Sequence, residues 1–121
     1  MKPLLEKELP TLLKRFDNFI DAELRSIEII SPTIIKITLA GQDSSRGFDW
    51  ITVELEFNDV SDAQLVESSK LSYLDMSDGV SIIFTDNLFA FGIGTYNSSS
   101  NIKNSSSFII SASLKYAEGS F

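Results

Sequence analysis

The chain has 121 residues and a net charge of −7, and it contains neither histidine nor cysteine. The missing cysteine excludes disulfides, thiolate nucleophiles and cysteine-based zinc sites, and the missing histidine removes the commonest general base and metal ligand. Apart from Lys14-Arg15 the basic residues are scattered, so we expect no nucleic-acid partner and no binding to an anionic membrane.

The length fits a single domain spanning residues 1–121. The first ten residues lack the apolar run of a signal peptide, which favours a cytoplasmic protein. We expect no metal and no cofactor, because no complete metal or dinucleotide motif is present.

The N-terminal residues have a helical spacing of apolar side chains. These side chains recur at steps of three and four, at Leu5, Leu9, Leu12, Phe16 and Phe19. The spacing predicts a helix over about residues 4–20 with one apolar face. Pro10 lies within it and suits the first position of the main helical segment.

The rest of the chain has the period-two pattern of strands. We predict strands over about residues 22–30, 33–40, 50–58, 79–85, 88–95 and 107–117. The first three follow one another without a helix-length connection, and this favours antiparallel pairing. Asp86-Asn87 is suited to a tight hairpin turn, because both residue types tolerate positive φ. In the last strand we expect one face to carry Phe108, Ile110, Ala112, Leu114 and Tyr116.

Two connecting segments are less regular. Residues 59–78 are compatible either with a helical turn around residues 62–69 or with an ordered loop. Residues 96–106 are polar and serine-rich, which predicts a mobile surface loop that contributes little to the core. Together the elements predict an α+β fold, with the N-terminal helix on a curved, mainly antiparallel sheet of about six strands. A small β-sandwich or a partly closed barrel is the alternative.

Trp50 is the main candidate for a binding residue. Ile51, Val53, Leu55 and Phe57 share one face of their strand, and Trp50 falls on the other. It therefore reads either as an exposed contact residue beside Arg46 and Phe48, or as a residue that turns into the edge of the core. On the polar side of the same strand, Glu54 and Glu56 extend the candidate surface.

Acidic residues gather between residues 59 and 78, and Asp75 and Asp78 are the candidates there for contact with a basic partner. Their spacing does not match a calcium loop, and Asp in turn positions commonly accepts hydrogen bonds from nearby backbone N–H groups. A different binding mode would use Trp50 with a shallow trough on a strand at Gly92 and Gly94, which suits a small molecule or a carbohydrate. No catalytic residue is assigned.

The segments "RGFDW", "LSYLDMSDGVSIIF" and "SLKYAEGSF" give the chain a resemblance to small, acidic bacterial proteins, among them the immunity proteins that neutralise toxins of competing cells. This resemblance implies a non-enzymatic protein that binds a protein partner, and the net charge of −7 favours a basic one. The alternatives are the small-molecule or carbohydrate-binding module and a structural subunit that self-associates, for example as a homodimer, through a free sheet edge.

Overall fold

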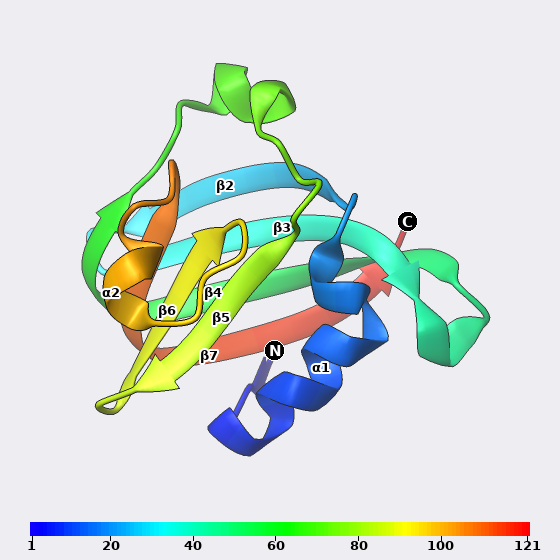
Figure 1. Cartoon of the computed structure of the whole chain (residues 1–121), viewed down its shortest axis with the longest axis horizontal. Coiled ribbons are helices and arrows are strands. Elements are labelled where there is room, and N and C mark those ends of the chain that lie inside the picture. Colours follow the sequence, from blue (N-terminus) through cyan, green and yellow to red (C-terminus); the bar gives the residue numbers. More distant parts are fainter.

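The computed structural model describes the backbone of residues 1–121 and the side chains of residues 1–67 and 69–121. One antiparallel sheet has the strand order β2-β3-β4-β7-β6-β5, with β1 paired to β7 (Figure 1). The strands are β1 (Lys2–Pro3), β2 (Glu23–Ser31), β3 (Ile34–Asp43), β4 (Asp49–Gln64), β5 (Val80–Thr85), β6 (Leu88–Ile93) and β7 (Phe108–Ser120). The α+β fold with a curved antiparallel sheet is therefore confirmed, and β2 and β5 remain as unjoined edges.

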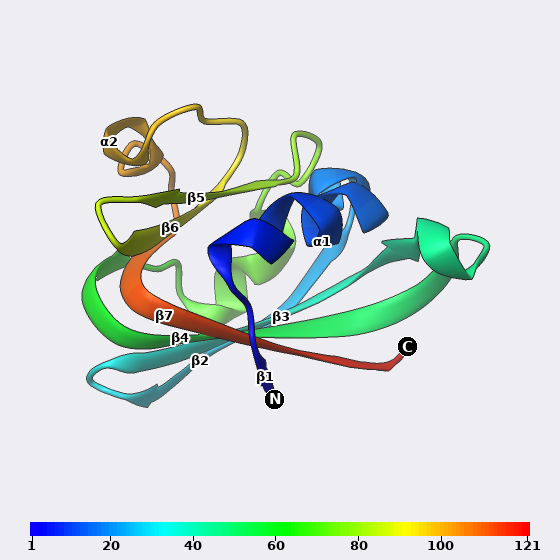
Figure 2. The same cartoon turned by 90° about the horizontal axis from the view of Figure 1, so that it is seen from below.

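The sheet curls over itself. Figure 2 shows β5 and β6 lying with the N-terminal helical segment over the layer formed by β2, β3, β4 and β7. The curl coincides with irregular backbone in β4, where Asp59 has a φ of 56° and the pairing with β7 shifts between Val60 and Asp62. Bulges of this kind bend a strand and increase its twist. Side chains from both layers, including Leu12, Leu55 and Phe91, fill the space between them.

The N-terminal helix is shorter than predicted. The segment forms a 3₁₀ turn η1 (Glu6–Glu8), the helix α1 (Leu9–Arg15) and a second turn η2 (Asp17–Phe19). The main helix begins near Pro10, as predicted, but its predicted end near residue 20 was wrong, because the three residues of η2 have positive φ values of 51°, 55° and 58° and reverse the chain. Of the five apolar residues that defined the helix, Leu5 is exposed and the others are buried.

The segment 59–78 combines a strand and a helix. β4 continues to Gln64, and a 3₁₀ helix, η4 (Ser68–Tyr73), follows. A helical turn around residues 62–69 was therefore wrong in position, because the pairing of β4 with β7 extends the strand. None of the described helices has the length and apolar character needed to span a bilayer.

The serine-rich segment 96–106 does contribute to the core, contrary to prediction. It contains a short helix, α2 (Ser99–Ile102), in which Ile102 is fully buried against Ala90, Phe108 and Ile110. Buried Ser105 donates through its Oγ to the carbonyl oxygen of Ile93 at 2.9 Å. The segment therefore covers the side of the β5–β6 hairpin that faces away from the main core.

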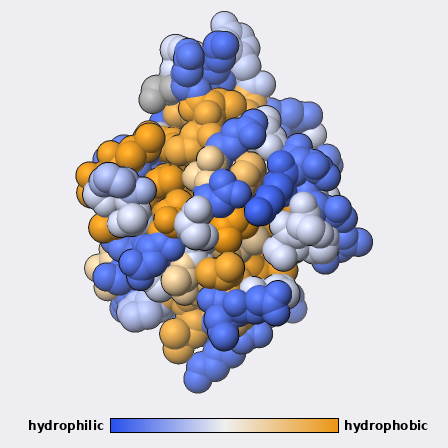
Figure 3. Space-filling view, turned by 90° about the vertical axis from the view of Figure 1, so that its left-hand side faces the viewer, coloured by the Kyte–Doolittle hydropathy of each residue, from blue (hydrophilic) through white to orange (hydrophobic). Residues whose placement is uncertain are grey.

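This second cluster also corrects the face predicted for β7. Phe108 and Ile110 pack under α2, Ala112 is exposed, and Leu114 packs in the main core. The residues do not share one face, because β7 passes through the curl of the sheet. Figure 3 views the molecule from the end where α2 lies and shows hydrophobic side chains between polar ones at the surface.

Candidate protein-binding surface

The connection between β3 and β4 is a compact turn with an unusual backbone. A 3₁₀ turn, η3 (Ser44–Arg46), is followed by Gly47 and Phe48, whose φ values are 65° and 66°. The Asp43 carboxylate accepts hydrogen bonds from Ser45 N at 2.9 Å and Ser45 Oγ at 2.7 Å. Phe48 N donates to the carbonyl oxygen of Asp43 at 2.9 Å, which closes the turn.

Positive φ is ordinary for Gly47 but strained for Phe48, because a bulky side chain rarely adopts the left-handed region. The Phe48 side chain is 62% exposed, so burial of the ring does not explain why the strain is tolerated. Strained residues of this kind concentrate at binding and catalytic sites. Phe48 therefore marks this turn as a candidate site on structural grounds that are independent of the sequence pattern.

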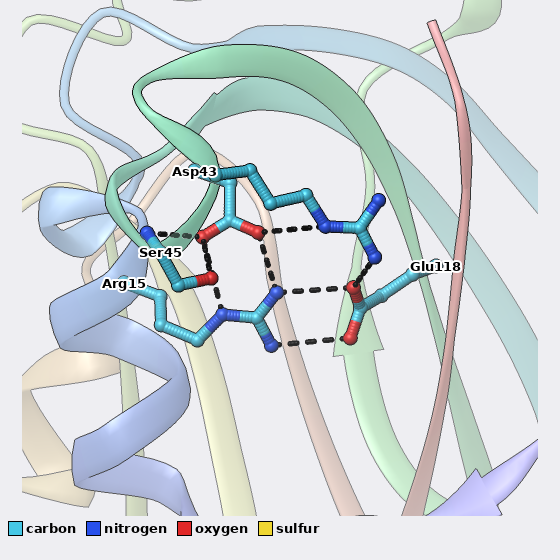
Figure 4. Close-up of polar contacts among 5 residues, drawn as sticks. Arg15, Asp43, Ser45 and Glu118 are labelled. Atoms are coloured by element: carbon cyan, nitrogen blue, oxygen red, sulfur yellow. Dashed lines mark hydrogen bonds and ion pairs between the residues drawn. The ribbon is translucent and has the colours of Figure 1, made fainter.

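An ion-pair cluster anchors the turn to the rest of the molecule (Figure 4). Arg15 Nε and Nη2 lie 3.2 and 2.6 Å from the two Asp43 carboxylate oxygens. Arg15 Nη1 and Nη2 also donate to the two carboxylate oxygens of Glu118, at 3.1 and 3.0 Å. Arg46 completes the group through Glu118 Oε1 at 3.2 Å and Asp43 Oδ2 at 3.5 Å. The cluster thus joins α1, the β3–β4 turn and β7.

The electrostatics of the cluster are balanced, with two cations facing two carboxylates. Asp43 is completely buried, and the Arg15 hydrogen bonds hold its pKa well below the usual range, against the opposing effect of desolvation. The same donor lowers the pKa of Glu118, and the two carboxylates raise the pKa of Arg15. Asp43 therefore remains ionised at neutral pH, and its role here is to hold the turn in place.

Trp50 lies outside the core, which agrees with the interpretation of an exposed residue and not with a ring turned into the edge of the core. It is 38% exposed, while its neighbour Ile51 is buried on the other face of β4. The Trp50 ring makes an edge-on contact with Phe121, with 5.5 Å between the ring centroids. Phe121 is itself 58% exposed and lies under the Arg25 guanidinium, which is 4.2 Å from its centroid. Phe48, Trp50 and Phe121 are called the aromatic surface below.

Two hollows border Trp50. One, of about 550 Å³, lies between the start of β4 and the end of β7 and includes Arg46, Glu118 and Phe121. The other, of about 370 Å³, includes Phe48 and reaches the η2 turn at Asp17. The aromatic surface thus consists of exposed rings with the two hollows that border Trp50, next to the turn that the ion-pair cluster anchors.

The remaining predicted site residues lie apart from the aromatic surface. Glu54 and Glu56 lie further along β4 on the same outer side; Glu54 pairs with Lys36 at 3.1 Å, and Glu56 accepts a hydrogen bond from Asn58. Asp75 accepts a hydrogen bond from Ser77 N at 2.9 Å in the loop before β5, and Asp78 is exposed in the same loop.

No ion pair or side-chain hydrogen bond joins Asp75 or Asp78 to the aromatic surface within the described side chains. Of the candidate residues, the structure brings together Arg46, Phe48 and Trp50. The backbone hydrogen bond at Asp75 and the ion pair at Glu54 are also ordinary features of turns and of solvated sheet faces.

The trough expected at Gly92 and Gly94 is filled. A Cβ on Gly92 would lie 3.3 Å from the Ile102 side chain, and one on Gly94 would lie 3.2 Å from the Tyr96 ring. The glycines accommodate side chains of the chain's own segment 96–106, so the prediction of an open trough at this position was wrong. Among the described residues, no group of three or more His, Cys, Asp or Glu side chains could hold a metal ion.

Sequence reasoning missed Arg15, Asp43, Glu118 and Phe121. One signal for Asp43 was present: it continues the inward-facing series Ile35, Ile37 and Leu39, so a charge there implies a buried partner. Nothing local identified that partner, because Arg15 lies on a different element. Comparisons of this chain with protein-family models, with curated protein sequences and with solved structures found no match.

Proposed function

We propose that this chain is a non-enzymatic protein that binds another protein through the aromatic surface. The observation that carries the proposal is the exposed Phe48 ring on a left-handed backbone. Asparagine or glycine would fit the same backbone with less strain. The cost in stability of a phenylalanine here therefore favours a functional role for its exposed ring.

The composition of the surface supports a protein partner. Trp and Arg are over-represented among the residues that dominate protein interfaces, and Trp50 shares one hollow with Phe48 and the other with Arg46. Arg46 is held by Asp43 and Glu118, which lowers the entropy that its side chain loses when a partner binds. The net charge of −7 would steer a basic partner toward the surface.

In its finer form, the proposal is that the partner is a toxin and the chain is its immunity protein in the bacterial cytoplasm. This form depends on the resemblance in size, acidity and element order described above. It makes the gene adjacent to the one for this chain the first source of a partner to test, because a toxin and its immunity protein are expected to be encoded together.

The experiment is co-expression of the adjacent gene product with this chain. Wild-type chain should restore growth and form a complex that survives gel filtration, while Trp50→Ala and Phe48→Ala should weaken the complex at least tenfold with little change in melting temperature. Tyr73→Ala is the matched control, since Tyr73 is an 83% exposed aromatic residue on η4. Equal binding by all four proteins would refute the role of the aromatic surface.

A further inference from the structure

The two edges of the sheet differ in how they are protected. Edge strand β2 has register shifts near both ends, between Leu24 and Ser26 and between Ile29 and Ser31, and it carries three charged residues. Edge strand β5, with the sequence VSIIFT, carries no charge and no proline and pairs with β6 without a shift. Bulges and charges are the usual devices that stop an edge from accepting another strand, and β5 lacks both.

The hairpin geometry identifies the backbone groups that face outward from β5. Asp86 and Asn87 have φ values of 55° and 62° and form a two-residue turn, so Thr85 and Leu88 form a hydrogen-bonded pair. Alternation then directs the backbone N–H and C=O groups of Ser81 and Ile83 toward β6, and those of Ile82 and Phe84 toward the free edge. Within the described residues, no hydrogen bond reaches the outward N–H or C=O groups of Ile82 and Phe84.

A groove of about 610 Å³ runs along this edge, between β5 and α1. Figures 1 and 2 both show α1 beside β5. The groove has an apolar floor that includes Leu9, Leu13 and Phe84, and its charged residues are Glu6, Lys14 and Asp17, which leaves it with a small excess of negative charge. Lys14 and Asp17 also line the hollow that includes Phe48 and Trp50, so the groove adjoins that hollow at these two residues.

We propose that β5 accepts an extended segment of the partner protein as an additional strand in this groove. Free backbone donors and acceptors in a row specify a strand as the occupant, because only an extended chain presents matching groups at the same spacing. The side chains of that strand alternate: those directed at the floor are apolar, and those directed at the rim with Glu6 and Asp17 are basic.

A second copy of this chain fits the groove less well than a basic partner segment. Its own β5 has no basic residue to place beside Glu6 and Asp17, and its other edge strand is bulged at both ends. This inference rests on the proposed function in that the partner is a protein, and it adds a second contact region to the aromatic surface.

The test uses a synthetic probe, acetyl-Lys-Val-Lys-Val-Lys-Val-amide, with the whole chain followed by NMR. Saturating peptide should slow hydrogen exchange of the Ile82 and Phe84 amides at least tenfold. The Ser81 and Ile83 amides, which already face β6, should change little and serve as an internal control. Binding should weaken several-fold in the Glu6→Lys variant, whereas Glu67→Lys, an exposed charge outside the groove, should leave it unchanged.

Two N-methylated peptides separate strand addition from general adhesion. A strand bonds to an edge through alternate residues, so methylation of one set of backbone nitrogens, either all valines or all lysines, should abolish binding, and methylation of the other set should not. Equal effects of the two peptides, no binding up to millimolar peptide, or dimerisation of the chain through β5 would overturn the proposal. Trp50→Ala should bind the peptide normally, so failure of the aromatic surface and failure of the groove are distinguishable.

Discussion

Arg15 and Asp43 form a two-point ion pair between α1 and the end of β3, and the carboxylate of this pair is completely buried. The pair holds the backbone of the β3–β4 turn against the helix, while the same Asp43 carboxylate accepts the Ser45 hydrogen bonds within the turn. The salt bridge therefore supports the turn that contains the strained Phe48 backbone.

Removal of the Asp43 charge should destabilise the chain strongly. Asp43→Asn removes the charge of a buried carboxylate and leaves the partly exposed Arg15 guanidinium with Glu118 as its remaining carboxylate partner, and we expect a loss of about 2 kcal/mol in the free energy of unfolding. Urea denaturation measures it. Glu54→Gln is the control, because it breaks an ion pair on the open sheet face and should cost no more than about 1 kcal/mol. Equal losses would mean that burial of the Arg15–Asp43 pair is unimportant.

Stability should fall on acidification because of the same cluster. The pKa values of Asp43 and Glu118 are lower in the folded chain than in the unfolded chain, chiefly because Arg15 donates to both carboxylates. A lowered folded-state pKa stabilises the fold above the unfolded-state value, near pH 4, and this stabilisation is lost as the pH falls from there toward the folded-state pKa. Denaturation at a series of pH values should show this loss, and Asp43→Asn should have a flatter acid limb than the wild type.

Phe48→Asn should stabilise the chain and weaken partner binding. Asparagine adopts positive φ more readily than phenylalanine, and little buried contact is lost from a ring that is 62% exposed, so we expect a gain of roughly 1 kcal/mol. Complex formation should weaken tenfold or more, since an exposed anchor is removed. Tyr73→Asn controls for the loss of an exposed aromatic ring. A Phe48→Asn variant that lost stability and kept binding would contradict the functional interpretation of the strain.

Gly79 should tolerate no side chain. It has a φ of 69°, and an added Cβ would lie 2.1 Å from the carbonyl oxygen of Asn18, in the left-handed η2 turn. We expect Gly79→Ala to cost at least about 3 kcal/mol, because steric overlap adds to the backbone strain. Gly47→Ala has nearly the same φ, 65°, but meets open space, and should cost only about 1–2 kcal/mol. The difference between the two melting temperatures measures the packing of η2 against the loop before β5.

Ile102→Ala should show that the serine-rich segment belongs to the folded core. Ile102 is fully buried, and its side chain fills the space next to Gly92. Its truncation should therefore lower the free energy of unfolding by about 3 kcal/mol. Ile29→Ala, at a 69% exposed isoleucine near the end of β2, should change stability by no more than about 0.5 kcal/mol. A negligible effect of Ile102→Ala would restore the view that residues 96–106 form a loop without a structural role.

The sequence by itself determined six of the seven strands, without β1 and without the extension of β4 to Gln64, together with the β5–β6 turn. Alternation along Ile51, Val53, Leu55 and Phe57 placed these side chains on the buried face, because neighbouring residues of a strand point to opposite sides whatever the strand packs against. The same alternation put Trp50 on the opposite side from Ile51, but it left open whether the ring is exposed or turns into the edge of the core. These features depend only on residues that are adjacent in the chain.

Only the tertiary structure decided which side chains contact one another at the β3–β4 turn and in the second hydrophobic cluster under α2. Arg15 reaches Glu118 across 103 positions in the sequence, and Ile102 fills the space above Gly92. Both contacts exist because the sheet curls, and the curl depends on irregular backbone in β4 together with the long pairing of β4 with β7. A local pattern carries no information on distances set by that curvature, so the buried ion pair and the core role of α2 were beyond what periodicity could predict.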